Sequence, residues 1–140
     1  MSKRGRRRLG RALAGSRGVG ERGSASVELV ILAPVLFLLM FATVQTGLWF
    51  HARALALGAA QDGARVAAAE SSSAGAGAAA AASFIADGGG EGVLVGSAAV
   101  GSRTATTATV TVTGTCPSVI PGWAPGIVQT ASLPVERITG

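Results

Sequence analysis

Few side chains in this 140-residue sequence are of the types that enzymes use, and their number limits the chemistry that the chain can perform. It has one histidine, His51, and one cysteine, Cys116. A metal centre or a nucleophile with its base needs several such groups close together. No glycine-rich phosphate loop joins a strand to a helix. The sequence therefore predicts no catalytic, cofactor-binding or metal-binding residue, no small-molecule substrate and no enzymatic activity.

The two lone groups have ordinary interpretations. His51 follows Trp49 and Phe50, aromatic residues of the kind found at membrane–water interfaces, and is interpreted as a solvated interfacial histidine. Cys116 has no second cysteine with which to form an intramolecular disulfide. An unpaired thiol is the favoured interpretation, and an intermolecular disulfide is the alternative.

Positive charge is concentrated at the start of the chain. The net charge is +5, yet residues 1–22 carry Lys3 and seven arginines against one acid, whereas from Ser24 onward acids outnumber arginines. A basic segment before an apolar one is typical of a positive-inside membrane anchor, so no nucleic-acid partner is expected. A twin-arginine export signal over residues 6–8 is a competing interpretation, but the apolar run begins about twenty residues later instead of directly after it.

The apolar run Leu29–Phe50 has no charged residue. At about 1.5 Å of rise per residue a helix of this length reaches roughly 33 Å, enough to cross a hydrocarbon core of about 30 Å. We therefore predict a transmembrane helix over residues 24–50 of a single-pass protein of the cytoplasmic membrane, with its N-terminus inside and its C-terminus outside. Pro34 removes the bond to the carbonyl of Val30, which predicts a kink.

The leader meets this helix at Gly23-Ser24-Ala25-Ser26-Val27-Glu28. Gly23 has no Cβ to hinder a protease, and Ser24 or Ser26 is expected to cap the helix. Glu28, in the first turn, suits the helix dipole, but at the edge of hydrocarbon an unpaired acid costs on the order of 2 to 3 kcal/mol. The arrangement resembles the cleavage site of type IV prepilins and pseudopilins. That resemblance implies a cut between Gly23 and Ser24 by a prepilin peptidase, which removes the basic leader 1–23, and pairing of Glu28 with the freed amine of a neighbouring subunit. A Glu28 that snorkels from an uncleaved anchor is the alternative.

Beyond the membrane, small residues recur every three or four positions, so the helix is expected to continue. A narrow stripe of this kind favours the packing of several copies side by side; it comprises Ala52, Leu55, Ala56, Ala59, Ala60, Gly63, Val66 and Ala67. Asp62 and Arg65, three residues apart, are expected to pair. Residues 71–77 are interpreted as a linker, with a further helical turn or two over 78–85. Residues 51–86 are thus the extracytoplasmic alanine-rich helix and its Ser/Ala/Gly linker.

The remaining residues, 87–140, favour β-structure. Asp87 and three glycines break the helix, after which residues 92–100 form a weak predicted strand and residues 104–113 a strong one. A third strand over residues 127–138 contains Pro134 and is expected at an edge. The predicted fold class is a membrane-anchored α+β protein: a long N-terminal transmembrane helix that extends outside the membrane, followed by a small antiparallel β-rich module packed on that helix.

Taken together, the chain resembles the TadE-like pseudopilins of the Flp/Tad pilus assembly system (TadE/TadG family). The similarity runs through the 22–28 junction, the span, and the stretch Ala59-Ala60-Gln61-Asp62-Gly63-Ala64-Arg65-Val66-Ala67, and ends in a short valine- and threonine-rich domain. The resemblance implies a minor pseudopilin whose helix is held in the membrane and is either incorporated into the extracellular pilus or primes its assembly. Its implied partners are the membrane, a prepilin peptidase, other pilin and pseudopilin subunits and the Tad assembly machinery. The alternative is an unprocessed single-pass surface scaffold or binding protein with no pilus role.

Overall fold

The computed structural model describes residues 20–137, with side chains from residue 26 onward. Contacts divide the chain into two compact units, Met1–Met40 and Phe41–Gly140. Helix α1 (Gly20–Ala68) is uninterrupted through Pro34. The helix begins earlier than the sequence indicated. Ser24 and Ser26 therefore lie inside it and do not cap it. Glu28 is consequently in its third turn, beyond the first turn where the helix dipole acts most strongly.

A second helix, α2 (Ala74–Asp87), replaces most of the predicted linker. Its start is fixed locally, because the side chain of Ser73 accepts a hydrogen bond from the N–H of Ala76 at 3.1 Å, as an N-cap residue does. Its alanine-rich sequence favours a helix, and the glycines from Gly88 onward end it as predicted. The linker interpretation of residues 71–77 was therefore wrong from Ala74 onward.

The C-terminal part is a three-stranded antiparallel sheet in the order β1-β2-β3. A single 3₁₀ turn, η1 (Gly90–Gly92), leads into β1 (Val95–Arg103), and β2 (Thr107–Thr115) and β3 (Gly126–Pro134) follow. The β2–β3 register is regular, whereas β1 and β2 slip between Val95 and Ala98, where Gly96 has a positive φ of 59°. All three predicted strands exist and β3 is at an edge, but β1 and β2 each lie about three residues later than expected.

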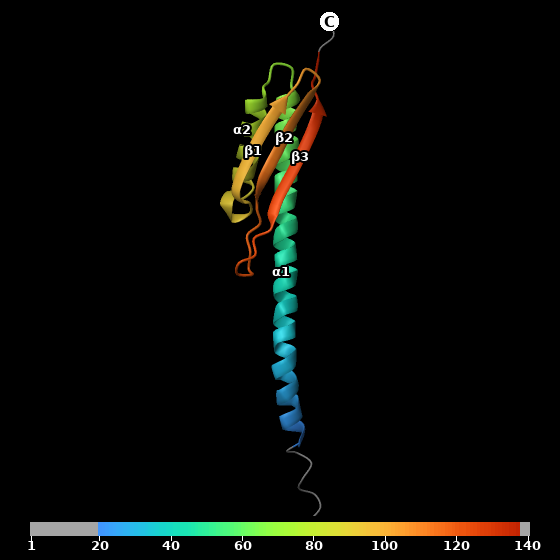
Figure 1. The fold of residues 1–140 in the computed structure, drawn as a ribbon, viewed down its shortest axis with the longest axis vertical. Coiled ribbons are helices and arrows are strands. Elements are labelled where there is room, and N and C mark those ends of the chain that lie inside the picture. The colour runs from blue at the N-terminus through green and yellow to red at the C-terminus, as the bar shows by residue number, and fades with distance from the viewer. Residues whose placement is uncertain (1–19, 138–140) are drawn as a thin grey trace, which may run out of the picture. The chain divides into compact units, whose positions relative to one another are not determined.

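Within the unit 41–140, the two helices cover one face of the sheet (Figure 1). Val110 of β2 contacts both helices. One of its methyl groups lies 3.1 Å from the position that a Cβ would have at Gly63 of α1, and the other lies 3.3 Å from the position that a Cβ would have at Gly77 of α2. The core is made mostly of alanine, completed by a few larger residues, among them Leu94, Val110, Val112 and Ile127. The structure confirms the α+β class with a small antiparallel sheet on the outer helix.

The small-residue stripe of α1 is covered by this chain itself. Six alanines of the outer half of α1 have no exposed surface: Ala52, Ala56, Ala59, Ala60, Ala64 and Ala67. The expectation that the stripe packs against other copies was therefore wrong. The physical reason is that α2 and the sheet, which follow it in sequence, approach it closely enough to fill the space that small residues leave.

Candidate functional site

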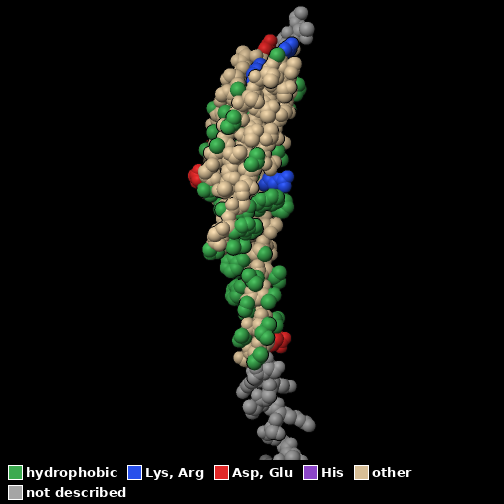
Figure 2. Space-filling view, in the orientation of Figure 1, with side chains coloured by type: hydrophobic (Ala, Val, Ile, Leu, Met, Phe, Trp, Pro, Cys, Tyr) green, Lys and Arg blue, Asp and Glu red, His purple; other side chains and the backbone are tan. Residues whose placement is uncertain are grey.

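The first half of α1 presents an apolar surface that no residue within 20–137 covers. Its most apolar 18-residue window has a mean hydropathy of 2.5, and no residue of that window is buried. Figure 2 shows hydrophobic side chains along this part of the helix. By length and composition α1 is able to cross a membrane. Lipid or neighbouring helices must cover its large exposed residues, which include Leu29, Val30, Ile31, Leu36, Phe37, Leu38 and Leu39.

The predicted processing residues lie at the start of this helix. The backbone of Gly23 and Ser24 is helical, not extended as a protease would need it. Glu28 is exposed, and among the side chains of residues 26–137 it has no ionic or hydrogen-bonding partner. The structure brings no cation to Glu28 from that part of the chain, so a charged partner has to come from elsewhere.

Gln45 of α1 is buried in a polar contact that the sequence did not reveal. Only 2% of its surface is exposed. Its Oε1 accepts hydrogen bonds from the N–H of Val119 at 3.0 Å and from the hydroxyl of Ser118 at 3.1 Å, and its Nε2 donates to the carbonyl of Pro117 at 3.3 Å. One amide thus binds the segment after β2 to the helix. The only signal in the sequence was a lone amide within an apolar run, which needs polar partners when buried.

Cys116 begins the segment that Gln45 holds. It is 1% exposed, and its thiol donates to the carbonyl of Pro117 at 3.0 Å. Burial raises the pKa of the Cys116 thiol, and the hydrogen bond from Gln45 opposes that rise. The thiol is therefore protonated at neutral pH and shielded from other chains in the folded state, in agreement with the interpretation of an unpaired cysteine.

Aromatic and basic side chains cluster on α1 just beyond Gln45. Trp49 and Phe50 pack edge to face with centroids 5.0 Å apart, and the guanidinium of Arg53 lies 5.3 Å from the ring of Trp49. His51 is exposed, and no group of three or more His, Cys, Asp or Glu that could hold a metal occurs among the described residues. Arg65 Nη1 lies 3.6 Å from Asp62 Oδ1, which confirms the predicted pair, although exposure makes it weak.

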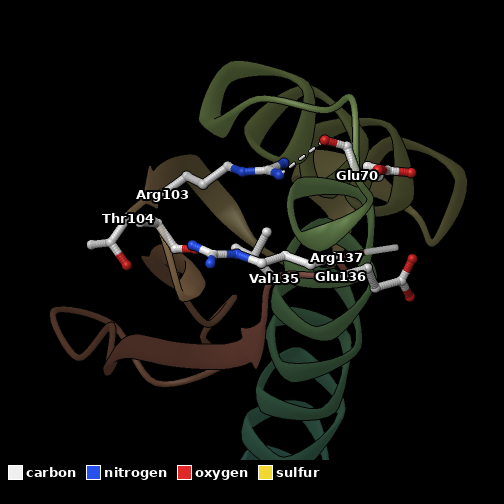
Figure 3. A pocket seen from close by; sticks show the side chains of 7 residues that line it. Glu70, Arg103, Thr104, Val135, Glu136 and Arg137 are labelled. Atoms are coloured by element: carbon white, nitrogen blue, oxygen red, sulfur yellow. Dashed lines mark hydrogen bonds between the residues drawn. The ribbon is translucent and has the colours of Figure 1, made fainter. Parts of the chain in front are cut away.

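A hollow of about 420 Å³ lies near the far end of the sheet, and its charged residues hold the fold together. Arg103 of β1 donates to the main-chain carbonyls of Ala67, Ala69 and Ser72, and to that of Glu70 at 3.2 Å (Figure 3). Ala67 is in the last turn of α1, where carbonyls lack partners within the helix, and the other three residues follow the end of that helix at Ala68. Arg137 likewise donates to the carbonyl of Ala105 at 2.6 Å. Both arginines are thus bound to main-chain carbonyls: Arg103 caps the end of α1, and Arg137 holds the turn between β1 and β2.

A comparison with known protein families shows which family part of the chain resembles. Residues 23–65 match the family described as TadE-like protein. Over this segment the chain is similar to TadE-like proteins. The match begins at Gly23, covers the exposed apolar part of α1 and most of its alanine stripe, and ends at Arg65 before α2 and the sheet. No curated protein and no solved structure matches the chain.

The TadE-like family is a structural family related to pili, and its members are not known as enzymes. The match supports involvement in the Tad pilus system, and the apolar helix supports association with the membrane. All of the matched residues are in α1.

Proposed function

We propose that this TadE-like protein is a minor pseudopilin of the Flp/Tad pilus, cut by a prepilin peptidase between Gly23 and Ser24. One observation carries the proposal: the TadE-like segment begins at Gly23 and continues into a helix whose most apolar window has no buried residue. A pilin-type subunit needs a mature N-terminus that is defined by cleavage. It also needs an apolar helix that is surrounded by lipid before assembly and by the helices of other subunits after it.

Cleavage requires the first turn of α1 to open. The peptide bond after Gly23 lies within helical backbone, whereas proteases act on extended chain. Gly20 and Gly23 make this turn weak, since each glycine costs about 1 kcal/mol of helix stability relative to alanine. The peptidase therefore meets a helix end that unwinds at low cost.

Once the leader is removed, Ser24 carries a new positive charge. The mature helix then starts about one turn before Glu28, which brings the acid back to the positive end of the helix. An unpaired carboxylate at the edge of hydrocarbon costs on the order of 2 to 3 kcal/mol. The amine of a neighbouring subunit would offset this cost, and Glu28 is exposed to receive it.

The orientation follows from the leader. Eight basic residues precede the span and hold the N-terminus in the cytoplasm, where anionic lipids attract each by about 1 kcal/mol. The unit formed by the outer half of α1, α2 and the sheet is then outside the cytoplasmic membrane. From there it enters the pilus with its neighbours.

The test compares glycine substitutions in cells with and without the prepilin peptidase. Gly23→Val should block the cut, because a β-branched side chain at the scissile bond hinders approach to the backbone, while Gly23→Ala should be cut, if more slowly. Gly20→Val is the matched control and should be processed, since it lies three residues before the bond. Intact-mass measurement should find Ser24 as the mature N-terminus. Identical masses for the wild-type chain with and without the peptidase would rule out processing.

An unprocessed membrane anchor is the second candidate. The continuous helix through Gly20–Glu28 favours it, because helical backbone resists proteolysis. This function predicts that the chain extracted from membranes keeps residues 1–23 and that the chain does not co-purify with pilin subunits.

A further inference from the structure

The segment 117–125, which we call the Trp123 loop, is bound to α1 at the outer end of the apolar run. Gln45 holds three consecutive residues of it, Pro117, Ser118 and Val119. Gln45 itself belongs to the uncharged run that ends at Phe50. The loop is therefore fixed beside the turns of α1 where a membrane-spanning segment gives way to the ectodomain.

The exposed surface of the Trp123 loop is apolar. Its sequence, Pro-Ser-Val-Ile-Pro-Gly-Trp-Ala-Pro, has no charged residue. Trp123 is 52% exposed and Val119 is 39% exposed. Loops that face water are normally polar, so the composition of this one requires a different surrounding.

The backbone of the loop is partly satisfied within the chain. The N–H groups of Val119, Ile120 and Trp123 donate respectively to Gln45 Oε1, to Ser118 Oγ at 3.0 Å and to the carbonyl of Ile120 at 3.2 Å. The three prolines, at 117, 121 and 125, have no N–H to satisfy. Half of the six N–H groups of the loop thus have a partner among the described residues, and the headgroup region still supplies water to the others.

From these observations we propose that the Trp123 loop lies in the headgroup region of the outer leaflet and acts as a second membrane contact beside α1. The proposal rests on insertion of α1 into the membrane and does not depend on cleavage at Gly23. Its occupant is lipid and not a second subunit, because the loop is continuous with the end of the span. Trp49, Phe50 and Arg53, residue types that mark a membrane interface, follow Gln45 on α1, and Arg53 is eight residues, or about 12 Å of helix, beyond it.

Such a contact would fix the rotation and height of the ectodomain on the membrane. A helix alone leaves a single-pass protein free to rotate and tilt, whereas a tryptophan at a second point restrains both. In the membrane this would present the outward face of the sheet, which carries the threonines of β2, in one defined direction.

Tryptophan fluorescence of the full chain in phosphatidylcholine–phosphatidylglycerol vesicles tests the proposal. The chain has only two tryptophans, so Trp49→Phe leaves Trp123 as the sole emitter. Lipids brominated near the headgroup should quench Trp123, and its emission should lie at shorter wavelength than that of a tryptophan in water. In the same background, Val119→Glu should reduce the quenching, because an acid resists transfer into the interface.

Two further single-tryptophan chains, both lacking Trp49 and Trp123, provide the controls. Phe37→Trp reports on the span and should be quenched by lipids brominated deep in the acyl chain. Ala105→Trp lies in the turn between β1 and β2, at the other end of the sheet and roughly 30 Å from the loop by strand rise, and should not be quenched.

Quenching of Phe37→Trp without quenching of Trp123 would overturn the loop contact while leaving the span intact. Absence of quenching at both would overturn membrane insertion and the loop proposal together. Equal quenching of Trp123 and Ala105→Trp would also contradict the proposal, because the ectodomain would then lie against lipid without a preferred contact.

Discussion

Gly63 on α1 offers a direct test of the close packing between the two helices. A Cβ at this position would lie 2.6 Å from the carbonyl oxygen of Gly77, 3.0 Å from the Cβ of Ala81 and 3.1 Å from a methyl group of Val110. Ordinary contacts of this kind are at least about 3.4 Å, and the nearest obstacle is backbone that cannot rotate away. Gly63→Ala should therefore push α2 and the sheet away from α1.

The expected cost follows from two opposing terms. Overpacking a well-filled core costs about 1 to 3 kcal/mol, and replacing glycine by alanine within a helix returns up to about 1 kcal/mol. We expect a net loss of about 1 to 2 kcal/mol, which changes the ratio of folded to unfolded protein by about 5- to 30-fold. Gly47→Ala is the matched control, because it makes the same change in the same helix with nothing within 4 Å of the new methyl group.

The single cysteine provides the assay. Cys116 is buried, so a maleimide reacts with it only when the ectodomain opens, and the labelling rate reports the open fraction. In detergent micelles Gly63→Ala should label about 5 to 30 times faster than the wild-type chain, while Gly47→Ala should label no faster. Thermal unfolding followed by circular dichroism should rank the three chains in the same order.

The result that refutes this reasoning is equal labelling of Gly63→Ala and Gly47→Ala. It would mean that the alanine stripe is not packed within the chain as described. A defect of Gly63→Ala in association with other copies, with unchanged labelling in dilute micelles, would restore the interpretation of the stripe as an interface between subunits.

Three further predictions concern the amide, the thiol and the acid. Gln45→Leu removes the partner of the Val119 N–H and one of the partners of the Ser118 hydroxyl, so it should cost about 1 to 3 kcal/mol and raise the labelling of Cys116; an unchanged rate would show that the loop does not depend on Gln45. Because burial raises the pKa of Cys116 above its ordinary value of 9.0, the folded state keeps a proton that the unfolded chain has lost, so stability should be full below that value and decline as pH rises through the folded pKa. Cys116→Ala should lose this dependence, which is measurable by denaturant titration because the chain has no tyrosine and its only lysine is Lys3. Glu28→Leu should be cut and inserted normally yet fail to co-purify with other pilus subunits, as judged by intact mass and affinity capture; assembly at the wild-type level would remove the pairing role.

Local patterns in the sequence were sufficient to predict the elements. The sequence has an apolar run after a basic leader, glycines after Asp87, and alternating threonine and valine over residues 109–113. Each of these patterns acts through solvent and near neighbours, so it can be recognised within its own segment. The helix, the three strands and the TadE-like relationship were predicted on this basis. The errors at element ends, such as the start of α1 at Gly20, arose because capping residues compete over short distances.

Tertiary structure alone decided what covers each surface. The small-residue stripe of α1 has the same sequence pattern whether it packs against a neighbouring subunit or against the chain's own sheet. Only the positions of α2 and β2 show that the chain itself covers it. Gln45 meets Val119 from 74 residues away, and Arg103 reaches the end of α1 from 36 residues away. Such pairings depend on how the elements pack together, and no pattern within one segment records them, which is why the sequence predicted an apolar span but not the loop that the span holds.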